Sequence, residues 1–204
     1  MKKPIFNEKE RNGLLAEREE LLNEYIVVKE KLRVLYEEND IDFILAVGGG
    51  SVIDSAKAIS IGVKYDGDVW DFYSGKAIPK EGLPIGTVLT IPAAGSESSS
   101  ASVITKINKK GENLKIGIGS EVLYPKFSIL NPEIAFTVPK FHVACGITDI
   151  MAHLMERYFT NVDNVELTDR LIESNMKTVI NNEHKVLENT ENYDSRAEIM
   201  WSGT

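Results

Sequence analysis

The sequence has little cysteine and no long hydrophobic run. Its 204 residues include one cysteine, Cys145, which cannot form an internal disulfide and is typical of a protein of the reducing cytoplasm. No stretch approaches the roughly 18 apolar residues of a membrane helix. The basic start, Met1–Lys3, lacks the apolar run of a secretory signal. We therefore expect a cytoplasmic protein without a membrane partner.

An excess of basic residues is also missing. The chain has 23 lysines and arginines against 31 aspartates and glutamates, a net charge of −8. Because this charge repels phosphate backbones, a broad nucleic-acid-binding face is excluded. An apolar fraction of 43% excludes a disordered or collagen-like chain. The length suits one full domain, or one domain and part of another.

The segment 8–40 is charged and helical in pattern. Apolar residues recur in it every seven positions, at Leu14, Leu21, Val28 and Leu35. This spacing predicts one or two amphipathic helices. Because Arg18 interrupts the apolar seam, a coiled-coil arm is one interpretation among three. The others are a helix packed on a sheet and a poorly ordered arm.

The middle of the chain alternates strand and helix patterns, which is typical of an α/β layer. The expected strands are Asp42–Val47, Leu83–Ile91, Ala101–Ile107, Lys115–Gly119 and Phe127–Leu130, and the expected helix is Val52–Val63. From Val138 onward only helical patterns remain, over Val143–Tyr158, Val165–Val179 and Ser195–Trp201. The composition therefore predicts a domain boundary near residue 136.

The first candidate site is the turn Gly48-Gly49-Gly50-Ser51 between a buried strand and a helix. Glycines let an anion approach the backbone, and the N-terminus of a helix offers free N–H groups and partial positive charge. The turn could hold a phosphate or could be a plain tight connection. Asp54 could close a capping box with Ser51 or could lie near a cofactor. We expect the capping box, and a solvated Lys57.

Two further candidates follow along the chain. The loop Thr90–Ser98 comes after a buried strand and is rich in small polar residues, so it could contact a ligand or be an ordinary loop. Asp149 and His153 are four residues apart on an expected helix and so share one face. A carboxylate and an imidazole suit Zn²⁺ or Fe²⁺, or form an ordinary polar pair. Their apolar surroundings indicate partial burial and a packed Cys145.

Four segments together resemble the metal-dependent, iron-containing alcohol dehydrogenase family, and its butanol dehydrogenase-like branch in particular. They are Asp42–Lys57 (DFILAVGGGSVIDSAK), Gly86–Glu97 (GTVLTIPAAGSE), Asn131–Pro139 (NPEIAFTVP) and Cys145–Tyr158 (CGITDIMAHLMERY). The resemblance implies a Rossmann-like domain followed by an all-helical domain, as in dehydroquinate synthase. It implies a partial dinucleotide-binding α/β domain at 28–136 and the first helices of a metal-binding domain at 137–204. The residues 1–27 do not resemble the family, and we expect a divergent helical arm there.

The resemblance also implies roles for particular residues. The pyrophosphate of NAD or NADP would lie on Gly48, Gly49, Gly50 and Ser51. Asp54, Thr87, Thr90, Ser96 and Lys115 would line the cofactor. Asp149 and His153 would be catalytic as two of the ligands of Fe²⁺ or Zn²⁺. The metal would bind the oxygen of a small alcohol or aldehyde, and hydride would pass to or from the nicotinamide.

The sequence departs from the family at both ends. Two histidine ligands of the family have no counterpart in this sequence. The remaining histidines, His142 and His184, do not match these ligands, and we expect both to be solvated. We therefore expect a middle section of such an enzyme, prone to homo-oligomerisation through uncovered surfaces. Three hypotheses follow: a dehydrogenase completed by another chain, an inactive remnant that at most binds a dinucleotide, and an interaction protein based on residues 8–40.

Overall fold

The computed structural model describes residues 36, 38–108 and 110–204, and the chain divides into two compact units, Met1–Asp42 and Phe43–Thr204. Of the first unit, only Tyr36 and the residues 38–42 are described, and they include the end of a helix. The amphipathic pattern between residues 8 and 35, with its coiled-coil interpretation, lies outside the described residues.

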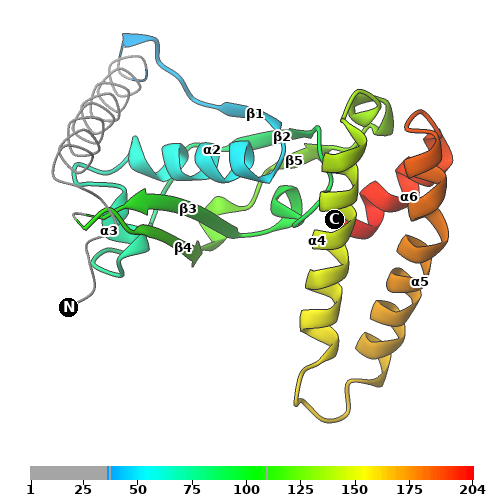
Figure 1. Ribbon diagram of the computed structural model, residues 1–204. Coiled ribbons are helices and arrows are strands. Elements are labelled where there is room, and N and C mark those ends of the chain that lie inside the picture. The colour runs from blue at the N-terminus through cyan, green and yellow to red at the C-terminus, as the bar shows by residue number, and fades with distance from the viewer. Residues whose placement is uncertain (1–35, 37, 109) are drawn as a thin grey trace, which may run out of the picture. The chain divides into compact units, whose positions relative to one another are not determined.

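The second unit contains a three-stranded parallel sheet. Its strands are β1 (Ile44–Gly48), β2 (Ile85–Leu89) and β5 (Phe127–Ile129), in the order β1-β2-β5. Each is a short run of apolar and β-branched residues, as the sequence predicts, and β2 is buried along almost its whole length. Figure 1 shows the three strands side by side, with their carboxyl ends at the same edge.

The helix α2 (Gly50–Gly62) follows β1 directly and covers one face of this sheet. Its buried Ile53 and Ala56 pack in one cluster with Ala46 of β1 and Leu89 of β2. The strand residues that alternate with these point to the opposite face. There Leu45, Val47, Phe127 and Ile129 are exposed, so among the described residues that face of the sheet is largely uncovered.

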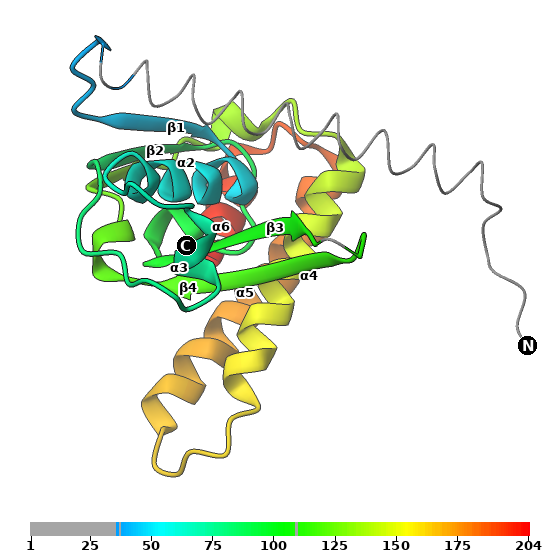
Figure 2. The same cartoon turned by 90° about the vertical axis from the view of Figure 1, so that its left-hand side faces the viewer.

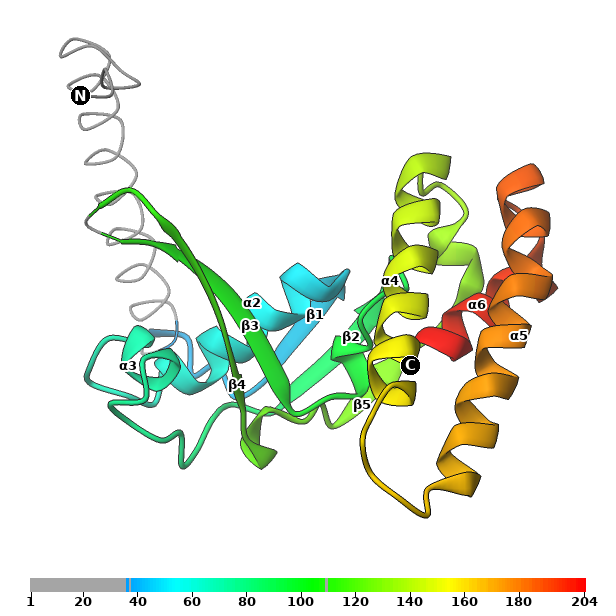
Figure 3. The same ribbon diagram turned by 60° about the horizontal axis from the view of Figure 1, so that its bottom comes forward.

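A separate hairpin pairs β3 (Ala101–Ile107) with β4 (Asn113–Gly119) in antiparallel fashion. Both strands are predicted from the sequence, and β4 begins two residues earlier than expected. The hairpin extends away from the parallel sheet in Figure 3. Its inner residues pack with the short helix α3 (Trp70–Tyr73) and with the end of α2.

Three helices form the C-terminal part of the second unit. They are α4 (Lys140–Tyr158), α5 (Glu166–Glu188) and α6 (Tyr193–Gly203), each longer than the sequence pattern predicts. Buried aliphatic residues from all three make one core: Val143, Ile147, Ile150, Leu154, Ile172, Val179, Val186 and Ile199. Figure 2 shows the α/β layer and this helical group as successive parts of the chain. The mixed α/β fold class is therefore confirmed.

Three single-turn helices complete the second unit. They are η1 (Ser96–Ser98), η2 (Glu121–Leu123) and η3 (Pro132–Ala135). η3 begins after Asn131, whose side chain accepts a hydrogen bond from the N–H of Glu133, so the Asn-Pro pair ends β5 and starts a turn. None of the helices in the described part of the chain combines the length and the apolarity that crossing a bilayer requires.

Candidate functional site

The glycine turn lies where β1 ends and α2 begins. Gly49 is the N-cap, and its carbonyl accepts hydrogen bonds from the N–H groups of Val52 and Ile53. No side chain caps the helix, so the N–H groups of Gly50 and Ser51 have no acceptor among the described hydrogen bonds. A Cβ atom added at Gly50 would meet nothing within 4 Å, so the first turn borders open space. This combination suits a bound anion.

The loop after β2 lies beside this turn. The N–H of Thr90 donates to the carbonyl of Gly48 at 3.1 Å, which joins the ends of the two strands. A Cβ atom added at Gly49 would be 3.5 Å from Cβ of Ile91, so the backbones run close together. Two adjacent parallel strands thus deliver both candidate segments to one edge of the sheet. In open α/β folds, ligands bind at this edge.

Asp54 does not close a capping box, so that expectation is wrong. Its carboxylate instead accepts a hydrogen bond from the hydroxyl of Ser96 at 2.6 Å and one from the N–H of Val103 at 3.1 Å. Its carbonyl accepts a third from the hydroxyl of Ser102. The partners are 42 and more residues away, and Asp54 therefore joins α2 to η1 and to the hairpin.

Lys57 is not solvated, so that expectation is also wrong. Its side chain is fully buried. Its Nζ donates to three carbonyl oxygens, those of Ser96, Ser99 and Ala101, at 2.6, 2.7 and 2.8 Å. Burial lowers the pKa of the ammonium to about 8, and the nearby carboxylates of Asp54 and Glu97 oppose that shift.

Thr87 is joined to the loop beside Ser96 through Ser128 and Glu97. The hydroxyl of Thr87 donates to that of Ser128 at 2.8 Å, and the hydroxyl of Ser128 donates to the carbonyl of Glu97 at 2.6 Å. Thr87 is fully buried, and it therefore supports the loop from beneath. The buried carboxylate of Glu97 accepts a hydrogen bond from the hydroxyl of Thr204 at 2.8 Å, which ties the loop to α6.

Glycines allow α4 and α6 to approach the same loop closely. Gly95 has a φ of +71°, and a Cβ atom there would lie 2.7 Å from the carbonyl oxygen of Gly203. A Cβ atom at Gly146 would overlap the carbonyl oxygen of Pro92. The loop is therefore held between α2 on one side and the two C-terminal helices on the other.

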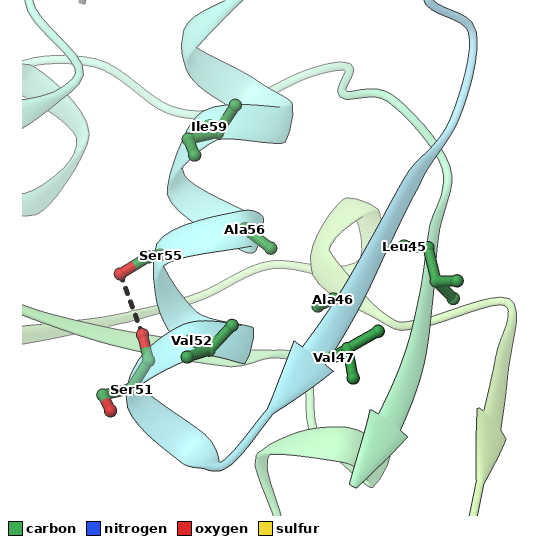
Figure 4. Close-up of a pocket in the computed structure, with 8 residues that line it drawn as sticks. All are labelled: Leu45, Ala46, Val47, Ser51, Val52, Ser55, Ala56 and Ile59. Carbon is green, nitrogen blue, oxygen red and sulfur yellow. Dashed lines mark hydrogen bonds between the residues drawn. The ribbon is translucent and has the colours of Figure 1, made fainter. Parts of the chain in front are cut away.

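A pocket of about 600 Å³ opens beside the glycine turn, between β1 and α2 (Figure 4). Its lining is mostly aliphatic and includes exposed side chains such as Leu45, Val47 and Val52. Ser51 is the one predicted site residue in the lining, and its carbonyl accepts a hydrogen bond from Ser55 at 2.8 Å. The pocket therefore adjoins the candidate phosphate site, but its lining is mostly aliphatic, with two serines, Ser51 and Ser55, as its polar side chains.

The second candidate centre is on α4. Oδ2 of Asp149 lies 3.9 Å from Nε2 of His153, and Nδ1 of His153 lies 3.6 Å from Oε2 of Glu156. The first two side chains are 47% and 41% exposed, which agrees with the expected partial burial. No cluster of three or more potential metal ligands occurs among the described residues. The described chain thus offers two neighbouring side chains of metal-binding type, both accessible from solvent.

The remaining candidates lie apart. Lys115 is exposed on β4, and no hydrogen bond or ion pair described for the chain joins it to the glycine turn. Cys145 is exposed and not packed, so that expectation is wrong. His142 and His184 are exposed, as expected. Sequence analysis missed the buried network of Lys57. The available signal was its position three residues after Asp54, on the same face of α2.

The chain belongs to the iron-containing alcohol dehydrogenase family. The family profile described as "Iron-containing alcohol dehydrogenase" matches residues 24–132. A second profile, "Fe-containing alcohol dehydrogenase family, C-terminal", matches residues 143–204. Both the glycine turn and the Asp149–His153 pair fall within the matched ranges. The suspected resemblance is therefore confirmed.

Named relatives agree with this assignment. The chain is 52% identical over 167 residues to a probable NADH-dependent butanol dehydrogenase of Bacillus subtilis, covering 82% of this chain and 42% of that protein. It is 38% identical to an NADPH-dependent aldehyde reductase of Escherichia coli, covering 83% and 44%. The crystal structure of an NADH-dependent butanol dehydrogenase A from Thermotoga maritima superposes with a TM-score of 0.80 at 36% identity, covering 86% and 43%. The chain thus spans less than half the length of these relatives.

Proposed function

We propose that this chain takes part in the NAD(P)H-dependent interconversion of small alcohols and aldehydes, such as butanol and butanal. The observation that carries the proposal is the meeting of two segments at the carboxyl ends of β1 and β2. The glycine turn and the Thr90–Ser96 loop are joined there by the Thr90–Gly48 and Ser96–Asp54 hydrogen bonds. The names of the relatives, butanol dehydrogenases and an aldehyde reductase, support the substrate class.

NAD or NADP would bind with its pyrophosphate at the first turn of α2. Gly48, Gly49, Gly50 and Ser51 would supply N–H groups and room, since a Cβ atom at Gly50 would enter open space. Thr90 and Ser96 would line the neighbouring wall. Asp54 and Thr87 would shape that wall through their hydrogen bonds to Ser96 and Ser128. Lys115 would reach the cofactor from the hairpin.

Fe²⁺ or Zn²⁺ would bind at Asp149 and His153. Their residue types and one-turn spacing suit either ion, and both side chains are accessible. Such an ion supplies Lewis acidity toward a substrate oxygen. The two residues fill half of a four-coordinate shell, so further ligands would come from outside the described residues. The local contribution of the chain is to fix these two ligands on one rigid helix.

The domain organisation and the assembly are part of the proposal. The arm would comprise 1–27, the dinucleotide-binding domain 28–136 and the start of the metal-binding domain 137–204. The exposed apolar face formed by Leu45, Val47, Phe127 and Ile129 supports a homo-oligomer. The single cysteine of the sequence supports a location in the reducing cytoplasm. Light scattering of the purified chain tests this, and a monomer at all concentrations contradicts it.

A second candidate function is dinucleotide binding without turnover. The observation that favours it is the ligand pair on α4, which the described residues do not extend to three. The glycine turn and the adjoining loop are formed within the chain, and they do not depend on that metal shell.

One experiment separates the two candidates. NADH and NADPH binding is followed by fluorescence, and their oxidation by butanal is then measured with Fe²⁺ or Zn²⁺ added. Metal-dependent oxidation that an Asp149→Ala variant loses supports the dehydrogenase. Binding without oxidation supports the second candidate. A folded chain that binds neither nucleotide contradicts both candidate functions. Lys76→Met, which changes an exposed lysine, serves as the control variant.

A further inference from the structure

The buried ammonium of Lys57 lies at the centre of the contacts that hold the candidate loop. Three carbonyl oxygens surround its Nζ at 2.6 to 2.8 Å, and the hydroxyl of Ser96 is at 3.2 Å. An ammonium has three N–H donors, which matches the three carbonyls. The accepting residues are 39 to 44 positions away, so the contact joins α2 to the segment Ser96–Ala101.

That segment contains the groups that define the wall of the proposed cofactor site. The hydroxyl of Ser96 donates to Asp54, and the N–H of Val103, two residues after the segment, donates to the other carboxylate oxygen. Lys57 follows Asp54 by three residues on the same helix. One face of α2 thus places the ammonium of Lys57 against the carbonyls of the segment. The same face places the carboxylate of Asp54 against the hydroxyl of Ser96 and the N–H of Val103.

We propose that Lys57 is a positioning residue for dinucleotide binding: its three hydrogen bonds to the Ser96–Ala101 segment fix the Ser96–Asp54 pair beside the first turn of α2. The inference rests on the proposed dinucleotide site. Lys57 itself is fully buried, so it acts through the loop and touches no ligand. Without the ammonium, the carbonyls of Ser99 and Ala101 lose this donor, and that of Ser96 keeps the N–H of Ser99 at 3.3 Å. The loop then loses the side-chain contact that ties these carbonyls to α2.

The pH dependence of binding gives a readout that separates positioning from simple stability. The charged groups that face the ammonium are Asp54 of α2 and Glu97 of η1. Burial lowers the pKa of Lys57 to about 8. Above that pH the neutral amine has two N–H donors for three carbonyls. The affinity for NADH should therefore fall between about pH 7 and about pH 9.5, a range in which the other lysines keep their charge.

The test compares the wild-type chain with Lys57→Met, which retains length and apolar bulk, and with Lys76→Met, which removes an exposed lysine. Circular dichroism establishes that each variant is folded, and NADH fluorescence gives the dissociation constant. We expect Lys57→Met to weaken NADH binding about tenfold and to abolish the pH dependence. Lys76→Met should change neither.

The outcomes are distinguishable. A folded Lys57→Met chain that binds NADH like the wild type, with the same pH profile, overturns the inference and leaves the proposed function standing. A folded wild-type chain that does not bind NADH overturns the proposed function and the inference together. If Lys57→Met does not fold, the pH dependence of NADH binding by the wild-type chain decides. A dissociation constant that stays level between about pH 7 and about pH 9.5 overturns the inference. A dissociation constant that rises above about pH 8 supports it.

Discussion

Replacing Gly146 by alanine tests the close approach of α4 to the candidate loop. A Cβ atom at this position would overlap the carbonyl oxygen of Pro92, which is backbone and cannot turn aside. Gly146 is buried in the interior of α4. Alanine would gain about 1 kcal/mol over glycine from its helix propensity. Overpacking against a fixed atom costs about 1–3 kcal/mol, and here the atom is backbone, so the upper part of that range applies.

The expected net result is a loss of about 1–2 kcal/mol in the free energy of unfolding. For a chain of this size that corresponds to a melting temperature lower by about 2–8 °C. Differential scanning calorimetry measures both quantities. Gly62→Ala is a matched control, because its Cβ atom would lie 3.5 Å from Cγ2 of Val69, an ordinary contact. The control should be neutral or stabilise the chain by up to about 1 kcal/mol.

The comparison can refute the reasoning directly. If Gly146→Ala raises the melting temperature as much as Gly62→Ala does, α4 is not held against Pro92, and the loop is not confined between α2 and the C-terminal helices. If the loss occurs as expected, a shift of the loop should accompany it, because the overlap can be relieved only by moving Pro92 or α4. NADH binding by the folded variant would then be weaker than in the control.

Three further predictions concern other parts of the second unit. Asn192→Ala removes the side-chain oxygen that accepts a hydrogen bond from the N–H of Ser195 at 3.1 Å at the start of α6. The free energy of unfolding should fall by about 1 kcal/mol. Urea unfolding measures it, and an unchanged midpoint would contradict the prediction. His153→Ala should reduce the affinity for Zn²⁺ measured by titration calorimetry. Because the side chain is 41% exposed, the melting temperature should not fall. A variant that binds Zn²⁺ as tightly as the wild type would show that His153 is not a ligand. The hydrogen bond from Tyr158 to Glu173, with the charge of that carboxylate, raises the pKa of the phenol. A raised pKa in the folded state gives stability that is present below about pH 10 and lost as pH rises through the folded pKa. Tyr158→Phe should remove a late-titrating tyrosine from the ultraviolet absorbance titration, and an unchanged curve would contradict the assignment.

The strands and the glycine turn were predictable because their signals are local. β1 and β2 are short apolar runs. Three glycines and a serine directly after such a run indicate a tight turn into a helix. The boundaries of α5 were harder to predict, because its last turns contain polar residues. Buried Val186 keeps them on the helical core, and the sequence pattern alone ends near Val179.

The partners of Asp54 and Lys57 were not predictable in this way. A carboxylate three residues after a serine at the start of a helix is the usual pattern of a capping box, and a lysine on a helix is usually solvated. The structure turns both side chains toward Ser96 and its neighbours, which lie about 40 residues further along the chain. Nothing in the local spacing specifies that this loop folds back over α2.

The sequence by itself determined the α/β class, the family and the positions of the candidate residues, because periodicity, glycine placement and motif order are properties of neighbouring residues. The tertiary structure alone decided which of those residues meet. It joins Asp54 to Ser96 and the glycine turn to Thr90 by hydrogen bonds, leaves Lys115 on the exposed hairpin, and buries Lys57. The physical reason is the hydrogen-bonding requirement of buried groups: the buried ammonium of Lys57 needs acceptors, and only the folded chain brings the carbonyls of a loop 39 to 44 residues away within its reach.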